Sequence, residues 1–189
     1  MQLVPPSMHC LRQLVAGDFA AASRESGLAF GDRTWPDDVE MREGLSVHLS
    51  GCEQNPRDRL WRVYMIAGDE GGMRVAIGHA GFKGGPSRQG EVEMYWCIEP
   101  RYRGRGIAKA AAVALSNYAF AKAQVRAIIA TIAWHNIASQ KVASAVGMRQ
   151  VADEVKHGLP LWRLARDAWR PVTVPMTVGG LPLDDDQLS

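Results

Sequence analysis

The segment Arg101-Tyr102-Arg103-Gly104-Arg105-Gly106-Ile107-Ala108 lies between a strand-like run and an alanine-rich run. Residues 92–98 read Val-Glu-Met-Tyr-Trp-Cys-Ile, the β-branched and aromatic content of a strand, and Pro100 ends it because proline cannot donate to a sheet ladder. Residues 107–124 are rich in alanine and contain no glycine or proline, which predicts a strong helix. The sequence therefore predicts a strand, a tight turn and a helix in succession.

The two glycines of this turn predict an anion-binding loop. Gly104 and Gly106 allow the backbone to approach a ligand closely. The first amide groups of a helix have no partners within the helix, and the positive end of its dipole lies there. A phosphate is the kind of group that such a helix start binds.

Length and composition limit the classes of protein to consider. With 189 residues, of which 47% are hydrophobic, the chain is expected to form one domain, residues 1–170, followed by an extended or disordered tail, residues 171–189. A net charge of +2 without a basic block argues against a nucleic-acid partner. No run of apolar residues is long enough for a membrane span. Three cysteines without Cys-x-x-Cys spacing predict neither a metal site nor disulfides, which fits a cytoplasmic protein.

Hydrophobic periodicity and turn residues predict the remaining elements. Strands are expected where β-branched and aromatic residues cluster between turn residues, at residues 8–15, 60–67, 73–83, 92–98, 125–134, 151–155 and 159–164. Helices are expected after capping residues or an early proline, at residues 18–26, 35–50, 107–124 and 136–146. The first three strands after residue 60 should be antiparallel neighbours, because short glycine-rich turns connect them.

The ordered set of motifs resembles the Gcn5-related N-acetyltransferases (GNAT family). Residues 103–108 match the family's pyrophosphate loop, Asn136-Ile137-Ala138-Ser139 resembles its Asn-x-x-Ser step, and Gly147-Met148 takes the place of its Gly-Phe pair. The match covers residues from about 60 to 165. The sequence of residues 92–106 is most similar to the branch of ribosomal-protein alanine acetyltransferases. This resemblance implies an α/β (α+β) fold with a mixed, mostly antiparallel sheet of six to seven strands and about four helices.

The resemblance also implies acetyl-coenzyme A (acetyl-CoA) as co-substrate, with no metal. The expected coenzyme contacts come from the end of the fourth family strand, the loop and the asparagine motif: Cys97, Ile98, Arg103, Gly104, Arg105, Gly106, Ile107, Ala108, Asn136 and Ser139. A backbone amide of Cys97 or Ile98 is expected to stabilise the oxyanion. Lys109, one helical turn inside, adds positive charge to the same field.

Two residues are candidates for proton transfer. Glu93 is nominated as the base that deprotonates the amine, directly or through water; the alternative is a sheet glutamate that is solvated or paired with an arginine. Many relatives carry a tyrosine seven residues after the asparagine as the acid, whereas this chain has Ala143. Ser139, a water, or unassisted release of the thiolate must then suffice, and Ser139 is equally a residue of the first helical turn.

The acceptor side is less defined by the sequence. We expect Trp35, Tyr95 and Trp96 to line the acceptor pocket. The resemblance implies that the acceptor is a primary amine, either a peptide N-terminus or a small molecule. The alternative function is a non-catalytic acyl-CoA sensor or interaction module, which the missing tyrosine and the tail suggest. Because family members often pair through closing strands or tails, the resemblance also suggests a homodimer bridged by residues 171–183.

Overall fold

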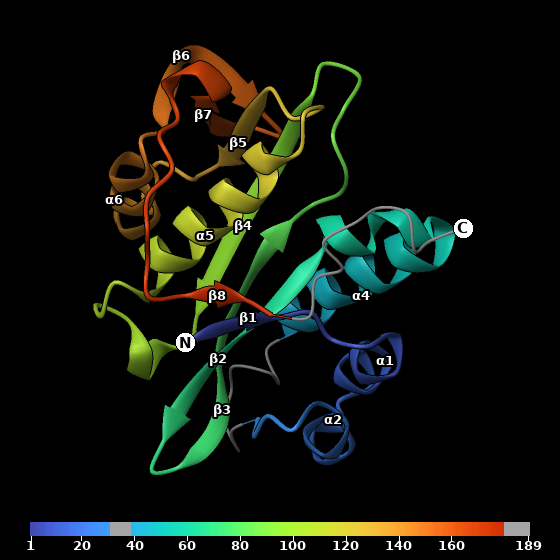
Figure 1. Ribbon diagram of the computed structural model, residues 1–189. Coiled ribbons are helices and arrows are strands. Elements are labelled where there is room, and N and C mark those ends of the chain that lie inside the picture. Colours follow the sequence, from blue (N-terminus) through green and yellow to red (C-terminus); the bar gives the residue numbers. More distant parts are fainter. Residues whose placement is uncertain (31–38, 180–189) are drawn as a thin grey trace.

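The computed structural model describes residues 1–30 and 39–179 (Figure 1). Its centre is a mixed eight-stranded sheet with the order β6-β7-β5-β4-β3-β2-β1-β8. The strands are β1 (Gln2–Val4), β2 (Val63–Glu70), β3 (Met73–Phe82), β4 (Glu91–Ile98), β5 (Ala127–Thr131), β6 (Arg149–Lys156), β7 (Leu159–Ala165) and β8 (Thr177–Val178). Only the β4–β5 and β1–β8 pairs among these are parallel.

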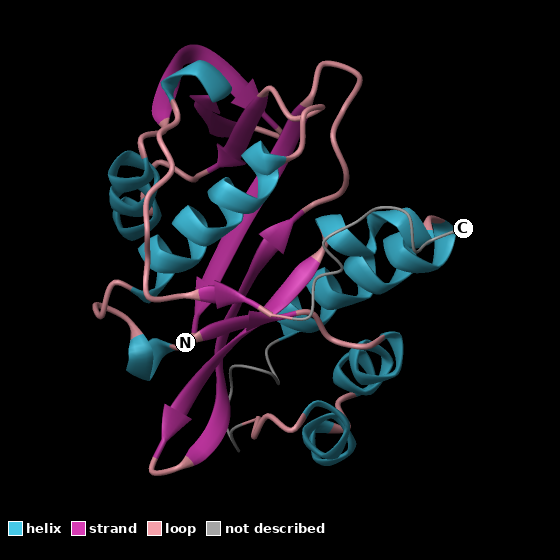
Figure 2. Cartoon of the chain, in the orientation of Figure 1, coloured by secondary structure: helices cyan, strands magenta, loops and turns pink. Residues whose placement is uncertain are grey.

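Helices cover both faces of the sheet (Figures 1 and 2). Within the described residues they are α1 (Met8–Ala16), α2 (Phe19–Ser26), α4 (Val39–Gln54), α5 (Ile107–Ala121) and α6 (Ile137–Val146). One face packs against α5 and α6, and the larger hydrophobic cluster lies there. The other face packs against α1, α2 and α4 through a smaller cluster. The fold class predicted from the sequence is confirmed.

Residues 8–15 form a helix, so the predicted strand is wrong. The hydroxyl of Ser7 accepts a hydrogen bond from the amide of Cys10 at 3.0 Å, which caps the start of α1. Gly17 ends the helix with φ of 79°. Cys10, Leu11 and Leu14 are the buried positions, a spacing that suits one face of a helix and not a strand. The sheet nevertheless has eight strands, more than the six or seven expected. The two additional strands, β1 and β8, are short and were not indicated by the sequence pattern.

The other predicted elements are present with shifted boundaries. The predicted hairpin is formed by β2 and β3, with Gly71 and Gly72 at positive φ in its turn. Its first strand begins late because residues Pro56–Trp61 form a 3₁₀ helix. The helix predicted for residues 35–50 is represented by α4, and its predicted start lies outside the described residues.

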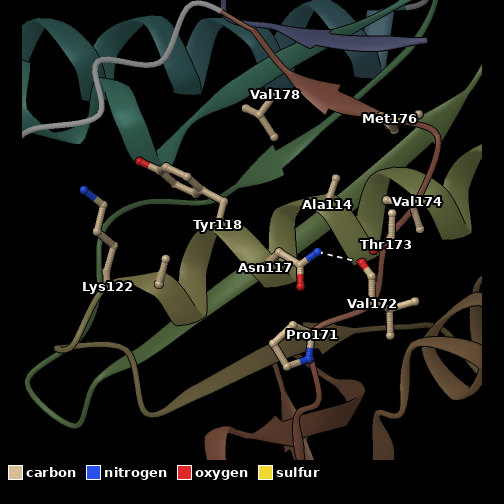
Figure 3. Close-up of a pocket in the computed structure, with 11 residues that line it drawn as sticks. Ala114, Asn117, Tyr118, Lys122, Pro171, Val172, Thr173, Val174, Met176 and Val178 are labelled. Carbon is tan, nitrogen blue, oxygen red and sulfur yellow. Dashed lines mark hydrogen bonds between the residues drawn. The ribbon is translucent and has the colours of Figure 1, made fainter.

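The chain after β7 returns along α5 to the opposite edge of the sheet. The side-chain Nδ2 of Asn117 donates to the carbonyl of Val172 at 2.9 Å, and an apolar groove of about 600 Å³ lies between α5 and this segment (Figure 3). Beyond the groove, β8 pairs with β1, so residues 177–179 lie beside the start of the chain (Figure 1). Among the residues that the structure describes, no helix has the length and apolarity that a membrane crossing requires.

Candidate active site

The loop after β4 has the geometry of an anion site. Gly104 has φ of 76° and Gly106 has φ of 75°, a region that other residues rarely adopt. A Cβ atom added at either glycine would meet nothing within 4 Å, so backbone conformation and not crowding requires glycine. Gly106 is the N-cap of α5 and provides no side-chain cap, which leaves the first amide groups of this helix to a ligand.

The arginines of the loop have different partners. Arg103 donates through Nε to the carbonyl of Ile98 at 2.9 Å and so ties the loop to the end of β4. Arg101 pairs with Glu99 at 2.8 Å and lies over the ring of Tyr102. Arg105 donates to the carbonyl of Arg101 at 3.2 Å. The loop is therefore held by its own side chains before any ligand is present.

A pocket of about 490 Å³ lies between the end of β4, the start of α5 and α6. It is lined by Trp96, Cys97, Ile98, Tyr102, Arg103, Gly104, Gly106, Ile107, Ala108, Lys109, Asn136, Ala138, Ser139, Lys141 and Val142. We call it the donor pocket. Nearly all of the predicted coenzyme residues are in this lining, and Arg105 is the exception. The cations Arg103, Lys109 and Lys141 and the α5 amides suit a phosphate-bearing ligand, so the residues present fit coenzyme A.

Sequence analysis named Ser139 of α6 but missed three other residues of this helix that line the pocket. Ala138, Lys141 and Val142 follow helical spacing of three and four residues and share the face turned to the pocket. This spacing is visible in the sequence, but only the packing of α6 against α5 shows which face is used. Asn136 is the N-cap of α6, and its Oδ1 accepts from the amide of Ser139 at 3.0 Å.

Strands β4 and β5 diverge beside the donor pocket. Their pairing runs from Glu91 with Ala127 to Glu93 with Ile129, while β4 continues to Ile98 alongside β3. The second half of β4 therefore has no pairing with β5, and the gap between the two strands connects the two faces of the sheet. Ligand atoms can therefore reach the backbone of β4 from the side where β5 has turned away.

The hydrogen-bond pattern of β4 shows which amides face this opening. Glu99 donates to the carbonyl of Ile77, and the carbonyl of Glu93 accepts from the amide of Lys83, so odd-numbered residues of β4 bond to β3. In an antiparallel pair, the alternate residues direct their backbone groups to the opposite edge. The amides of Trp96 and Ile98 are thus directed toward the opening. Of the two predicted oxyanion donors, the geometry favours Ile98 over Cys97.

Glu93 lies on the α4 side of the sheet in a dense polar cluster. Its carboxylate is 2.5 Å from the Nζ atom of Lys83 and 2.6 Å from that of Lys156, and it accepts from the hydroxyl of Thr131 at 2.9 Å. Burial disfavours the charged form, but these hydrogen bonds outweigh it and hold the pKa of Glu93 below its ordinary value. The alternative of an ion pair describes this geometry, with lysines in place of the expected arginine. The assignment of Glu93 as the base stays a prediction.

A second pocket, of about 310 Å³, lies on the same side of the sheet as Glu93. Met41, Gly44, Val47, His48, His79, Lys83 and Tyr95 line it, and we call it the α4 pocket. The rings of His48 and Tyr95 are stacked with centroids 5.0 Å apart. Burial lowers the pKa of His48 to about 4 and that of His79 to about 3, so both imidazoles are neutral near pH 7.

The three aromatic candidates for the acceptor pocket separate in the structure. Tyr95 lines the α4 pocket, while Trp96 points to the opposite face of β4 and lines the donor pocket. Trp35 lies outside the described residues. Sequence analysis did not single out His48, whose signal is its helical spacing from Met41 and Gly44 on one face of α4.

Comparisons with known proteins agree with this architecture. An N-acetyltransferase of Bacillus subtilis named YnaD, itself uncharacterized, is 38% identical over 58 residues, which cover 31% of this chain and about a third (34%) of that relative's length. An acetyltransferase structure from Agrobacterium tumefaciens is 24% identical with a TM-score of 0.56, over 86% of this chain and 88% of that one. RimL, a ribosomal L7/L12 α-N-protein acetyltransferase in complex with coenzyme A, is 16% identical with a TM-score of 0.57, over 88% and 94%. At these identities the structures support the fold alone.

A sequence model of the family described as "Acetyltransferase (GNAT) domain" matches residues 10–149. These residues include the loop, β4 with its divergence from β5, and the asparagine motif that together form the donor pocket. Because the match covers well over half of the sequence, the chain belongs to the GNAT acetyltransferase family.

Proposed function

We propose that this protein transfers an acetyl group from acetyl-CoA to a primary amine, by direct transfer in a ternary complex. One observation carries the proposal: adjoining residues of β4 line two pockets, Tyr95 the α4 pocket and residues 96–98 the donor pocket. The divergence of β4 from β5 lies at this boundary. Donor and acceptor can therefore approach each other through the sheet.

The donor pocket provides the groups that a bound coenzyme needs. The amides at the start of α5, with Arg103, Lys109 and Lys141, complement the charge of phosphates. Bound there, acetyl-CoA supplies an activated acetyl thioester. The amide of Ile98 is directed toward the opening, where it can stabilise negative charge on the thioester oxygen.

The acceptor amine must lose a proton, and two side chains are candidates to receive it. Glu93 is the candidate from the sequence. His48 is the candidate from the structure, because the residue is only 7% exposed and its Nδ1 has no hydrogen-bond partner among the described residues. A neutral imidazole can accept a proton directly or through a water molecule.

Release of coenzyme A across a panel of amines tests the proposed function. We expect turnover with the wild type and a fall of about 100-fold or more in kcat for whichever of Glu93→Gln and His48→Asn removes the base. An unchanged kcat in Glu93→Gln rules out Glu93 as the base.

Calorimetry with acetyl-CoA separates the enzyme from the sensor alternative. Acetyl-CoA binding together with turnover supports the transferase. Tight binding without turnover of any amine would contradict the proposed function and support a non-catalytic acyl-CoA-binding module.

A further inference from the structure

We infer that the α4 pocket accepts an amine whose far end carries a carboxylate group, and that Lys83 and Lys156 bind that carboxylate. This inference rests on the proposed acetyl transfer with His48, and not Glu93, as the base, and it names the class of acceptor. The class includes small ω-amino acids and peptide N-termini with an acidic residue close to the amine. It excludes polyamines as preferred acceptors.

Lys83 and Lys156 place two positive charges around Glu93, on the side of the sheet that α4 covers. A single carboxylate, that of Glu93, lies between their ammonium groups at 2.5 and 2.6 Å. Because Thr131 also donates to this carboxylate, its hydrogen-bonding capacity is largely used within the cluster. The lysine side chains remain 49% and 41% exposed, so both are accessible to a second anion.

The two lysines and Glu93 leave one net positive charge, and the neighbouring charged residues do not neutralise it. Arg163 is paired with Glu91, which lies two residues before Glu93 on the same face of β4. Together, Lys83, Lys156 and Arg163 outnumber Glu91 and Glu93 by one charge. The described lining of the α4 pocket contains no carboxylate, so nothing there complements the second ammonium of a polyamine.

The spacing along β4 sets the length of the acceptor. Cys97 belongs to the donor pocket, Tyr95 to the α4 pocket, and Glu93 to the lysine cluster, and all three side chains share one face. The two residues from Tyr95 to Glu93 span about 7 Å of strand. An amine beside Tyr95 and a carboxylate beside the lysines at Glu93 are therefore separated by about five methylene groups. Met41, Val47 and the ring of Tyr95 provide the apolar wall for such a chain.

A matched series of three amines tests the inference: 6-aminohexanoate, 1-aminohexane and 1,6-diaminohexane. They share the reacting amine and the chain, and they differ only in the charge of the far end. We expect kcat/KM to be about tenfold higher for 6-aminohexanoate than for 1-aminohexane, and lowest for the diamine, since an added charge-assisted hydrogen bond contributes about 1.5 kcal/mol. The peptides Ala-Ala-Glu-amide and Ala-Ala-Gln-amide test the peptide source in the same way.

Lysine variants assign the preference to the cluster. Lys83→Met and Lys156→Met should each reduce the ratio of kcat/KM between 6-aminohexanoate and 1-aminohexane toward one. Lys122→Met is the control, because it removes the same charge from the end of α5 on the other face of the sheet, and it should leave the ratio unchanged. The ratio is internal to each variant, so partial loss of folded protein does not alter it.

The outcomes separate the two proposals. Turnover of all three amines with equal kcat/KM, or with preference for the diamine, overturns the inference while leaving acetyl transfer intact. A carboxylate preference that persists in both lysine variants overturns the role of the cluster. Absence of turnover with every amine overturns the proposed function, and the inference with it.

Discussion

Gly106 shows how a single residue determines the donor pocket. It begins α5 in the left-handed region of backbone conformation, with open space where a side chain would lie. The required conformation, and not packing, is therefore the reason for glycine.

The variant Gly106→Ala should lower the free energy of unfolding by about 1 kcal/mol, because an L-residue in this conformation is strained. Gly44→Ala is its matched control. Gly44 also has nothing within 4 Å of an added Cβ, but it lies within α4 and is not among the glycines with positive φ. This control should gain about 0.5 kcal/mol or more. Urea denaturation measures both, and a shift of both variants in the same direction would contradict the argument.

Glu93 shows the limit of residue-level reasoning. The alternation of β4 placed Glu93 and Tyr95 on one face, which agrees with the structure, because Lys83 bonds to Glu93 and lines the α4 pocket together with Tyr95. The residues around its carboxylate are Lys83 directly after β3, Thr131 of β5 and Lys156 of β6, which lie 10, 38 and 63 positions away in sequence. Such partners depend on strand order, which local patterns do not specify.

At the scale of elements, α6 depends on its cap. Asn136→Ala removes the side-chain oxygen that accepts from the amide of Ser139, and it should cost about 1 kcal/mol of stability. Ser139→Ala keeps that amide and serves as the control, so its stability should match the wild type. Thermal unfolding measures both.

The same pair of variants resolves the role of the Ser139 hydroxyl. If this hydroxyl assists the leaving thiolate, kcat falls in Ser139→Ala although its stability is unchanged. An unchanged kcat restricts Ser139 to lining the donor pocket.

Helix α1 is the element whose type was predicted wrongly from the sequence. Residues 8–15 contain enough apolar and β-branched character to suggest a strand, but Ser7 and Gly17 cap a helix at the two ends. The buried set at positions 10, 11 and 14 would have indicated the helical period. The caps were decisive because they satisfy backbone groups that a short helix otherwise leaves exposed.

At the scale of the whole molecule, buried histidines couple stability to pH. The pKa of His48 falls to about 4 and that of His79 to about 3, while both are near 6.5 in the unfolded chain. Below pH 6.5 the unfolded state binds protons that the folded state excludes, so stability is lost as the pH falls toward 4. Between pH 7 and pH 5, each histidine should reduce the free energy of unfolding by about 2 kcal/mol.

Urea denaturation at pH 7 and pH 5 checks this prediction. His48→Phe should show a smaller loss between the two pH values than the wild type, because it removes one of the two titrating groups. Equal losses in the two proteins would contradict the assignment to His48. Glu93 titrates at lower pH and contributes little in this window, because its pKa is already below the ordinary value for a glutamate.

The sequence by itself determined the strand, glycine turn and helix of residues 92–121, the helix α6 and the family, because backbone conformation and helix propensity act between near neighbours. Only the tertiary structure decided that β4 diverges from β5, that Ile98 faces the opening, and that His48, Tyr95 and Lys83 share a pocket. These features arise from pairing and packing between segments far apart in the chain, and the free energy of such contacts depends on the whole fold.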